Sequence, residues 1–202
     1  MNSFDDRAST WDTPERIERA KNVAKAIIKS VSLSSNMNAL EYGCGTGLLS
    51  FELREYLGQI TLADVSIGML ATLSQKIVAA GITNFRTIKL DLTTDPLPEE
   101  KYDIIYTMLT LHHIEDIENI FHCFHSMLNE NGVICIADLD KEDGTFHDKG
   151  FDGHLGFDRV ELKRLAEKCD FRNISFQTAY SIPREREGIL CQYPMFLMTA
   201  YR

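Results

Sequence analysis

Residues 39–50 read ALEYGCGTGLLS, a short apolar run that leads into a glycine-rich loop and then into helix-forming residues. The loop carries three glycines at alternate positions, Gly43, Gly45 and Gly47, shortly after Glu41. In a doubly wound sheet the first strand-to-helix turn lies where ligands bind, at the carboxyl ends of the strands. Glycines at this turn allow a ligand to contact the backbone closely. We therefore expect this loop to hold a ligand.

Short apolar runs alternate with helical patterns along the rest of the chain. The runs that predict strands are residues 39–42, 60–63, 85–90, 102–107, 133–137, 174–177 and 196–200, and the helical patterns are residues 14–30, 48–56, 67–80, 116–128 and 158–168. Alternation of strand and helix indicates βαβ units and a mostly parallel sheet with helices on both faces. The predicted fold class is α/β, a doubly wound sheet of seven strands.

The last two predicted strands have no helix between them. Residues 181–192 contain Pro183 and a charged run, which do not favour a helix. We expect these two strands to pair as a hairpin at the edge, so that the last strand is antiparallel to the others.

Composition favours one globular domain with a small-molecule partner. The 202 residues are 44% hydrophobic and 25% charged, which is typical of a single domain with a sizeable core. The formal net charge of -9 opposes nucleic-acid binding, because phosphate backbones are bound by clustered Lys and Arg. We therefore predict a small-molecule partner and no nucleic-acid partner.

The sequence also predicts a cytoplasmic location without a membrane partner. No apolar run approaches the length needed to span a bilayer. The first ten residues, MNSFDDRAST, carry acids where a secretory signal would carry basic and then apolar residues. The five cysteines form no C-x-x-C pair, so neither a disulfide framework nor a thiolate zinc site is predicted.

The familiar nucleotide fingerprints do not fit the glycine loop. The pattern G-x-G-x-x-G would require glycine at position 48, which is Leu48, and the chain has no G-K-[ST] phosphate loop. Asp64, however, ends the second predicted strand about 20 residues after the glycines, where a carboxylate can accept the hydroxyls of a ribose. Asp91 ends the third, where it can accept from an adenine amino group. The pattern indicates adenosine without a diphosphate.

These motifs resemble those of the class I S-adenosylmethionine-dependent methyltransferases, especially the small family of ubiquinone-biosynthesis and general methyltransferase domains. The similar stretches are LEYGCGTG, LADVS, KLDL, YDIIYTMLTLHHIED and LNENGVICIADLD, which cover nearly the whole chain in the order and spacing of the family. The resemblance implies a Rossmann-like methyltransferase domain over residues 1–202, in which residues 1–30 form a helical segment covering the active site and residues 38–202 form the core.

The same resemblance implies a function and a set of cofactor contacts. S-adenosylmethionine would donate a methyl group to a small-molecule acceptor by in-line displacement, with S-adenosylhomocysteine as the product, in a monomer or homodimer. By position in the motifs, the implied contacts are Glu41 near the methionine amino group, Gly43 and Gly45 along the methionine portion, Asp64 at the ribose, Val65 and Met69 beside the adenine, Asp91 and Leu92 at the adenine edge, and Thr107 or Met108 along the cofactor.

Two adjacent histidines are candidate catalytic residues. His112 and His113 follow the fourth predicted strand, and imidazole titrates near neutral pH, so either can act as a general base toward the acceptor. The alternative is that both shape the pocket. A sulfonium is already a good leaving group, so positioning can carry most of the catalysis.

Other segments are candidates for the acceptor side. In the resembling family the segment after the fifth strand forms part of the acceptor wall, which suggests Asp140, Phe146, His147 and Phe151; the alternative is a solvated loop. The pattern of residues 14–30 predicts an amphipathic packing helix. Of the aromatic residues before it, Phe4 and Trp11 either cover the site or belong to the core.

No metal site is predicted. His122, Cys123 and His125 raise the possibility of a metal site, because residues three apart share a helix face, but no second cluster with ligand spacing accompanies them. Two alternative functions stay open: a noncatalytic, regulatory S-adenosylmethionine-binding module, and a nicotinamide-dependent oxidoreductase. The second is disfavoured by Leu48 and by the absence of a tyrosine followed four residues later by lysine.

Overall fold

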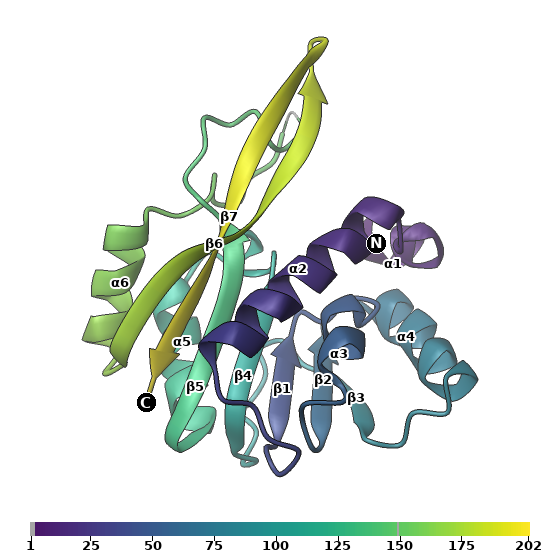
Figure 1. Cartoon of the computed structure of the whole chain (residues 1–202), viewed down its shortest axis with the longest axis vertical. Coiled ribbons are helices and arrows are strands. Elements are labelled where there is room, and N and C mark those ends of the chain that lie inside the picture. Colours follow the sequence, from purple (N-terminus) through teal and green to yellow (C-terminus); the bar gives the residue numbers. More distant parts are fainter. Residues whose placement is uncertain (1–2, 149) are drawn as a thin grey trace.

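Within residues 3–148 and 150–202, which the computed structural model describes, seven strands form one mixed sheet in the order β3-β2-β1-β4-β5-β7-β6 (Figure 1). The strands are β1 (Ala39–Tyr42), β2 (Ile60–Asp64), β3 (Phe85–Lys89), β4 (Tyr102–Met108), β5 (Leu128–Leu139), β6 (Arg172–Arg186) and β7 (Ile189–Tyr201). Met1 and Asn2, which belong to the predicted N-terminal segment, and Lys149 lie outside the described residues.

Strand direction confirms the predicted fold class. Strands β1 to β5 pair in parallel with one another, and β7 pairs antiparallel with both β5 and β6. Because β1 lies between β2 and β4, the chain leaves β1 toward one side of the sheet and reaches the other side only at β4. This is the topological switch point, where the connecting loops separate and leave room for a ligand.

Helices cover both faces of the sheet (Figure 1). Their bounds are α1 (Ser3–Arg7), η1 (Ala8–Thr10), α2 (Pro14–Ser30), α3 (Leu48–Leu53), α4 (Ile67–Ala79), η2 (Leu111–His113), α5 (Ile117–Met127) and α6 (Arg159–Lys168). Successive strand residues point to opposite faces. Leu40 and Ile105 accordingly pack in the apolar layer of α5 and α6, whereas Ala39 and Ile104 pack in the layer of α2, α3 and α4.

The last two strands are much longer than the sequence predicts. They form a hairpin that extends beyond the sheet (Figure 1), and Ile189 and Leu190 near its turn are each 67% exposed. Pro183 does not end β6, because β6 is the edge strand of the sheet, and proline is tolerated at an edge. The predicted antiparallel hairpin is thus confirmed, with longer arms.

Two aspartates fasten the N-terminal segment to the carboxyl ends of β1 and β2. The carboxylate of Asp5 accepts hydrogen bonds from the Ser66 hydroxyl at 2.5 Å and from the Gly68 N–H at 2.8 Å. Asp12 accepts from the Thr46 hydroxyl at 2.5 Å. These contacts place α1, η1 and the start of α2 over the loops that follow the first two strands.

We predict that Gly156→Ala destabilises the fold far more than Gly188→Ala. Both glycines have positive φ, 70° and 79°, so each alanine carries about 1–2 kcal/mol of left-handed strain. A Cβ at Gly156 would also lie 2.2 Å from the Asp140 carbonyl oxygen, which adds about 1–3 kcal/mol, whereas no described heavy atom lies within 4 Å of a Cβ at Gly188. Urea unfolding of the two variants measures the difference, and equal losses would show that the close approach has no energetic weight.

Candidate functional site

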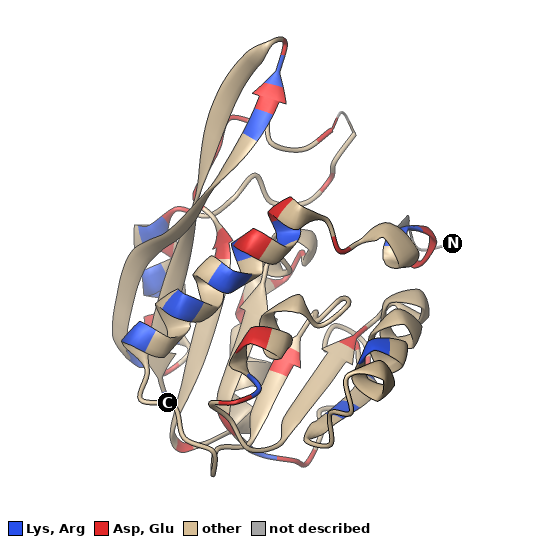
Figure 2. Cartoon of the chain, turned by 45° about the vertical axis from the view of Figure 1, so that its right-hand side comes forward, with Lys and Arg blue, Asp and Glu red and all other residues tan. Residues whose placement is uncertain are grey.

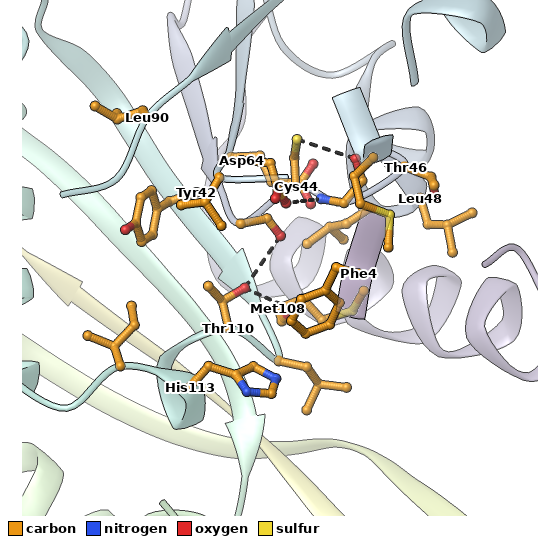
Figure 3. A pocket seen from close by; sticks show the side chains of 18 of the residues that line it. Phe4, Tyr42, Cys44, Thr46, Leu48, Asp64, Leu90, Met108, Thr110 and His113 are labelled. Atoms are coloured by element: carbon orange, nitrogen blue, oxygen red, sulfur yellow. Dashed lines mark hydrogen bonds between the residues drawn. The ribbon is translucent and has the colours of Figure 1, made fainter. Parts of the chain in front are cut away.

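A cavity of about 510 Å³ lies at the carboxyl ends of β1, β2 and β4, next to the N-terminal segment (Figure 3). The glycine loop, the loop after β4 and the first two turns of α2 all contribute to it. Its lining consists of Phe4, Trp11, Arg16, Arg19, Glu41, Tyr42, Gly43, Cys44, Gly45, Thr46, Leu48, Leu49, Asp64, Val65, Met69, Leu90, Asp91, Thr93, Met108, Leu109, Thr110, His113, Ile114, Glu115 and Asp116.

The glycines of the loop serve different needs. Gly45 has a φ of 53°, and the only described atom near a Cβ at this position is Nε1 of Trp11 at 3.7 Å, so a side chain would project into the cavity. At Gly43 a Cβ would lie 2.3 Å from the side chain of Thr110, which packs on the loop from the end of β4. Gly43 is thus needed for packing, and Gly45 leaves the cavity open beside the backbone.

Asp64 joins the loop after β1 to the loop after β2. One carboxylate oxygen accepts from the Gly45 N–H at 2.7 Å (Figure 3). The other accepts from the Ser66 N–H at 2.8 Å. Burial raises the pKa of Asp64 above its ordinary value, while the hydrogen bonds from Ser66 and Gly45 act in the opposite direction. Asp64 therefore shapes the site in addition to lining it, and its removal would leave two backbone donors without their acceptor.

Glu41 is a buried acid at the bottom of the cavity. Its side chain is 2% exposed and accepts a hydrogen bond from the Ser50 hydroxyl, which lies 2.6 Å from the hydroxyl of Tyr106. Burial raises the pKa of Glu41 to about 8. The carboxyl group is therefore largely protonated at neutral pH, and a cation placed beside it would favour the ionised form.

Most of the residues predicted to form the site lie together. The cavity is lined by Glu41, Gly43, Gly45, Asp64, Val65, Met69, Asp91, Met108 and His113.

Three of the predicted residues do not line the cavity. Thr107 precedes Met108 on β4 and points to the opposite face of the sheet, so the structure selects Met108 of that pair. Leu92 packs in the core, and its N–H donates to the Tyr42 hydroxyl at 3.2 Å. His112, the third, is also buried.

The two adjacent histidines have different environments. His112 is 3% exposed, and its Nδ1 lies 2.7 Å from Oδ1 of the buried Asp138. His113 faces the cavity, where its ring packs edge-on against Phe4 with centroids 5.4 Å apart. Burial lowers the pKa of His113 to about 4, with a further contribution from His112. At neutral pH His113 is therefore an uncharged, weakly basic imidazole.

The residues expected on the acceptor wall do not line the cavity. Asp140 forms a two-point ion pair with Arg159 of α6, at 2.6 and 2.7 Å. Phe146 is buried in the core. His147 stacks on Phe151 with centroids 3.6 Å apart, and both rings lie behind His112 and His113. They support the histidines from outside the cavity.

Sequence reasoning missed two arginines in the lining, Arg16 and Arg19. Arg16 lies on the same stripe of α2 as the buried Ala20, Val23 and Ile27, and Arg19 lies three residues further on the same side. A sequence signal was therefore present, because both arginines interrupt the apolar side of the amphipathic pattern at the start of the helix. Of the possibilities considered for Phe4 and Trp11, the structure places both in the cavity lining.

Within the described ranges, no set of three or more His, Cys, Asp or Glu side chains is arranged to hold a metal ion. In the same residues, none of the helices combines the length and the apolar character needed to cross a membrane.

Comparison with known proteins finds methyltransferases among those that are similar to this chain. Residues 39–132 match the family described as "Methyltransferase domain". An uncharacterized methyltransferase of Schizosaccharomyces pombe is 28% identical over 171 residues, which cover 77% of this chain and 58% of that protein. Phosphoethanolamine N-methyltransferase 1 of Zea mays is 30% identical over 122 residues, which cover 59% of this chain and 24% of that protein.

Solved structures agree on the fold. A SAM-dependent methyltransferase from Aquifex aeolicus superimposes with a TM-score of 0.74 at 19% identity, over 98% of this chain and 97% of that one. Together these matches confirm the resemblance to class I S-adenosylmethionine-dependent methyltransferases. The chain spans little more than half of the yeast relative and about a quarter of the maize relative.

We predict that Glu41→Gln weakens the pH dependence of stability. The pKa of Glu41 is raised from 4.5 to about 8, so the folded state holds a proton that the unfolded state has lost. The contribution of Glu41 to the free energy of unfolding is therefore fully present below about pH 4.5. It falls as pH rises toward about 8, by up to about 1.4 kcal/mol per pH unit. Glu41→Gln should remove this decline in urea unfolding between about pH 5 and about pH 8, whereas Glu52→Gln, on the exposed side of α3, should keep it. Identical slopes for the two variants would contradict the buried-acid interpretation.

Proposed function

We propose that the chain binds S-adenosylmethionine in this cavity and transfers the methyl group to a small-molecule acceptor, leaving S-adenosylhomocysteine, as its similarity to methyltransferases suggests. The observation that carries the proposal is the glycine loop, whose backbone at Gly45 is open to a cavity that also contains the carboxyl groups of Glu41 and Asp64. We also propose that residues 1–202 form one methyltransferase domain, with residues 1–30 covering the site.

The residues present fit the chemistry of this cofactor. Asp64 and Asp91 supply acceptors for ribose hydroxyls and for an adenine amino group, and Val65 and Met69 supply apolar surface for the adenine. Glu41 supplies a carboxylate for the methionine ammonium, whose positive charge would offset the burial that now keeps Glu41 protonated. When bound, S-adenosylmethionine provides a methyl group on a sulfonium that is already a good leaving group.

The protein then has to hold the acceptor atom in line with the methyl group and the sulfur, and to exclude water. Phe4, Trp11 and His113 form an aromatic part of the lining, with Phe4 5.8 Å from Trp11 and 5.4 Å from His113 between ring centroids. The low pKa of His113 makes its imidazole available as a hydrogen-bond acceptor but weak as a store for a proton. Its proposed role is therefore to position the acceptor.

The relatives and the charge of the chain support a small-molecule acceptor. The maize relative is named for phosphoethanolamine, a small molecule. The net charge of -9 disfavours a nucleic-acid acceptor, since such partners are bound through clustered basic residues.

We predict that S-adenosylhomocysteine raises the Tm of the wild type, and that NAD does not. At about 100 times its Kd a ligand adds about 2.7 kcal/mol, which corresponds to several degrees in a domain of this size. Gly45→Ala should abolish the rise, because its methyl group would project into the cavity. Gly81→Ala is the matched control, since Gly81 has a similar φ of 62° and no described atom within 4 Å of a Cβ. Equal stabilisation of both variants would show that the loop is only a structural turn.

We predict that His113→Asn lowers turnover by less than about tenfold and leaves the shape of the pH profile unchanged. A general base is worth about 10²–10⁴-fold, whereas a positioning residue is worth less. The acceptor for this assay comes from a screen of cell extract with labelled S-adenosylmethionine, in which the product is identified by mass. His122→Asn, on the exposed side of α5, is the control. A hundredfold loss of turnover with unchanged cofactor affinity would make His113 the base, and cofactor binding without any methylated product would favour the noncatalytic module.

A further inference from the structure

Two arginines of α2 line the cavity without an acidic partner. Arg16 donates to the Trp11 carbonyl at 2.8 Å, and its guanidinium carbon lies 3.9 Å from the centroid of the Trp11 ring. Arg19 lies three residues further, on the same side of the helix. Neither arginine forms an ion pair with any residue that the structure describes.

Arg19 is the more exceptional of the two. Its Nε atom is buried and has no hydrogen-bond partner in the described part of the chain. Burial lowers the pKa of Arg19 to about 10, followed by repulsion from Arg16, and the effect of the exposed Glu15 is smaller than that repulsion. Buried polar groups in folded proteins are nearly always hydrogen-bonded, and buried charges are nearly always paired. A guanidinium in this position therefore lacks a counter-charge.

Another basic residue nearby adds to the lack of negative charge around Arg19. Arg184 of β6 acts on both Arg16 and Arg19 and disfavours their charged forms further. Figure 2 shows basic positions recurring along α2 and near the end of the β6–β7 hairpin, with acidic positions between them. The chain as a whole has 30 acidic and 21 basic residues, so the shortage of negative charge around Arg19 is local. An anionic ligand would supply the missing negative charge.

The cavity offers two candidate anions, the carboxylate of the cofactor and a group of the acceptor. Arg16 packs on Trp11, and Nε1 of Trp11 lies 3.7 Å from the position of a Cβ at Gly45, so Arg16 belongs to the glycine-loop end. Arg19 lies one turn further along α2, within the electrostatic reach of Tyr180 and Arg184 on β6. Arg19 thus starts from a position further along α2 than Arg16, and of the two only Arg19 is influenced by Tyr180 of β6.

We propose that Arg19 binds a carboxylate or phosphate group of the methyl acceptor, an inference that rests on the proposed function. The planar guanidinium can hold either group through two parallel hydrogen bonds, which fixes orientation as well as position. An acceptor anchored by its anionic end at α2 presents its other end to the part of the cavity between Phe4, Trp11 and His113. The acceptors are therefore small anions, and the acidic side chains at the strand ends remain available for the cofactor.

The test uses inorganic phosphate as the probe, with the full chain saturated with S-adenosylhomocysteine and the ionic strength matched with chloride. Saturation fills the cofactor's own carboxylate position, so any remaining phosphate site belongs to the acceptor. Phosphate should raise the Tm of the wild type and of Arg164→Gln, an exposed arginine of α6 that serves as the matched control. Arg19→Gln should weaken apparent phosphate affinity by roughly tenfold or more while S-adenosylhomocysteine affinity, measured by calorimetry, stays at the wild-type value.

Each other result overturns the inference. Phosphate stabilisation that appears only without S-adenosylhomocysteine, or a loss of S-adenosylhomocysteine affinity in Arg19→Gln, would assign the arginine to the carboxylate of the cofactor. Phosphate stabilisation that is absent from the wild type or unchanged in Arg19→Gln would remove the anion site. If S-adenosylhomocysteine itself fails to stabilise the wild type, the proposed function and this inference both fail. If S-adenosylhomocysteine stabilises the wild type and only the phosphate results differ from those expected, this inference alone fails.

Discussion

The Asp64 carboxylate, through its hydrogen bonds to the N–H groups of Gly45 and Ser66, is the contact on which the site depends. It links the loops that follow the first two strands, and these loops carry most of the cavity floor. Ser66 in turn caps α4 and donates its hydroxyl to Asp5 of the N-terminal segment. One buried acid thus couples the glycine loop, the start of a helix and the cover of the cavity, at the cost of desolvating a carboxylate.

The acidic and basic side chains that line the cavity come from different elements, and this arrangement organises its chemistry. The acids Glu41, Asp64 and Asp91 lie at the strand ends, while Arg16 and Arg19 approach from α2. Burying acidic and basic side chains in one cavity without pairing them lowers the stability of the protein when no ligand is bound. Their cost is understandable if a ligand provides the missing partners, with a cationic amino group at Glu41 and anions at the arginines.

Tertiary structure decides which of two adjacent candidate residues faces the cavity, which the sequence could not distinguish. Thr107 and Met108 are neighbours, and the side that faces the cavity is set by the pleat of β4 between β1 and β5. His112 and His113 are also adjacent, yet one is held by Asp138 of β5 and the other faces the cavity. Such choices depend on partners far along the chain, which no local pattern contains.

The sequence by itself determined the fold class and the floor of the site. Hydrophobic periodicity is local, so it predicted α2 at residues 14–30 and β1 at residues 39–42 with the bounds that the structure has, and the strand-end rule brought Asp64 and Asp91 to one edge. The long β6–β7 hairpin and the cavity-facing Arg19 were decided only by tertiary structure. An edge strand tolerates proline, and whether an arginine beside the buried stripe of α2 faces a cavity or the core depends on what long-range packing places opposite it.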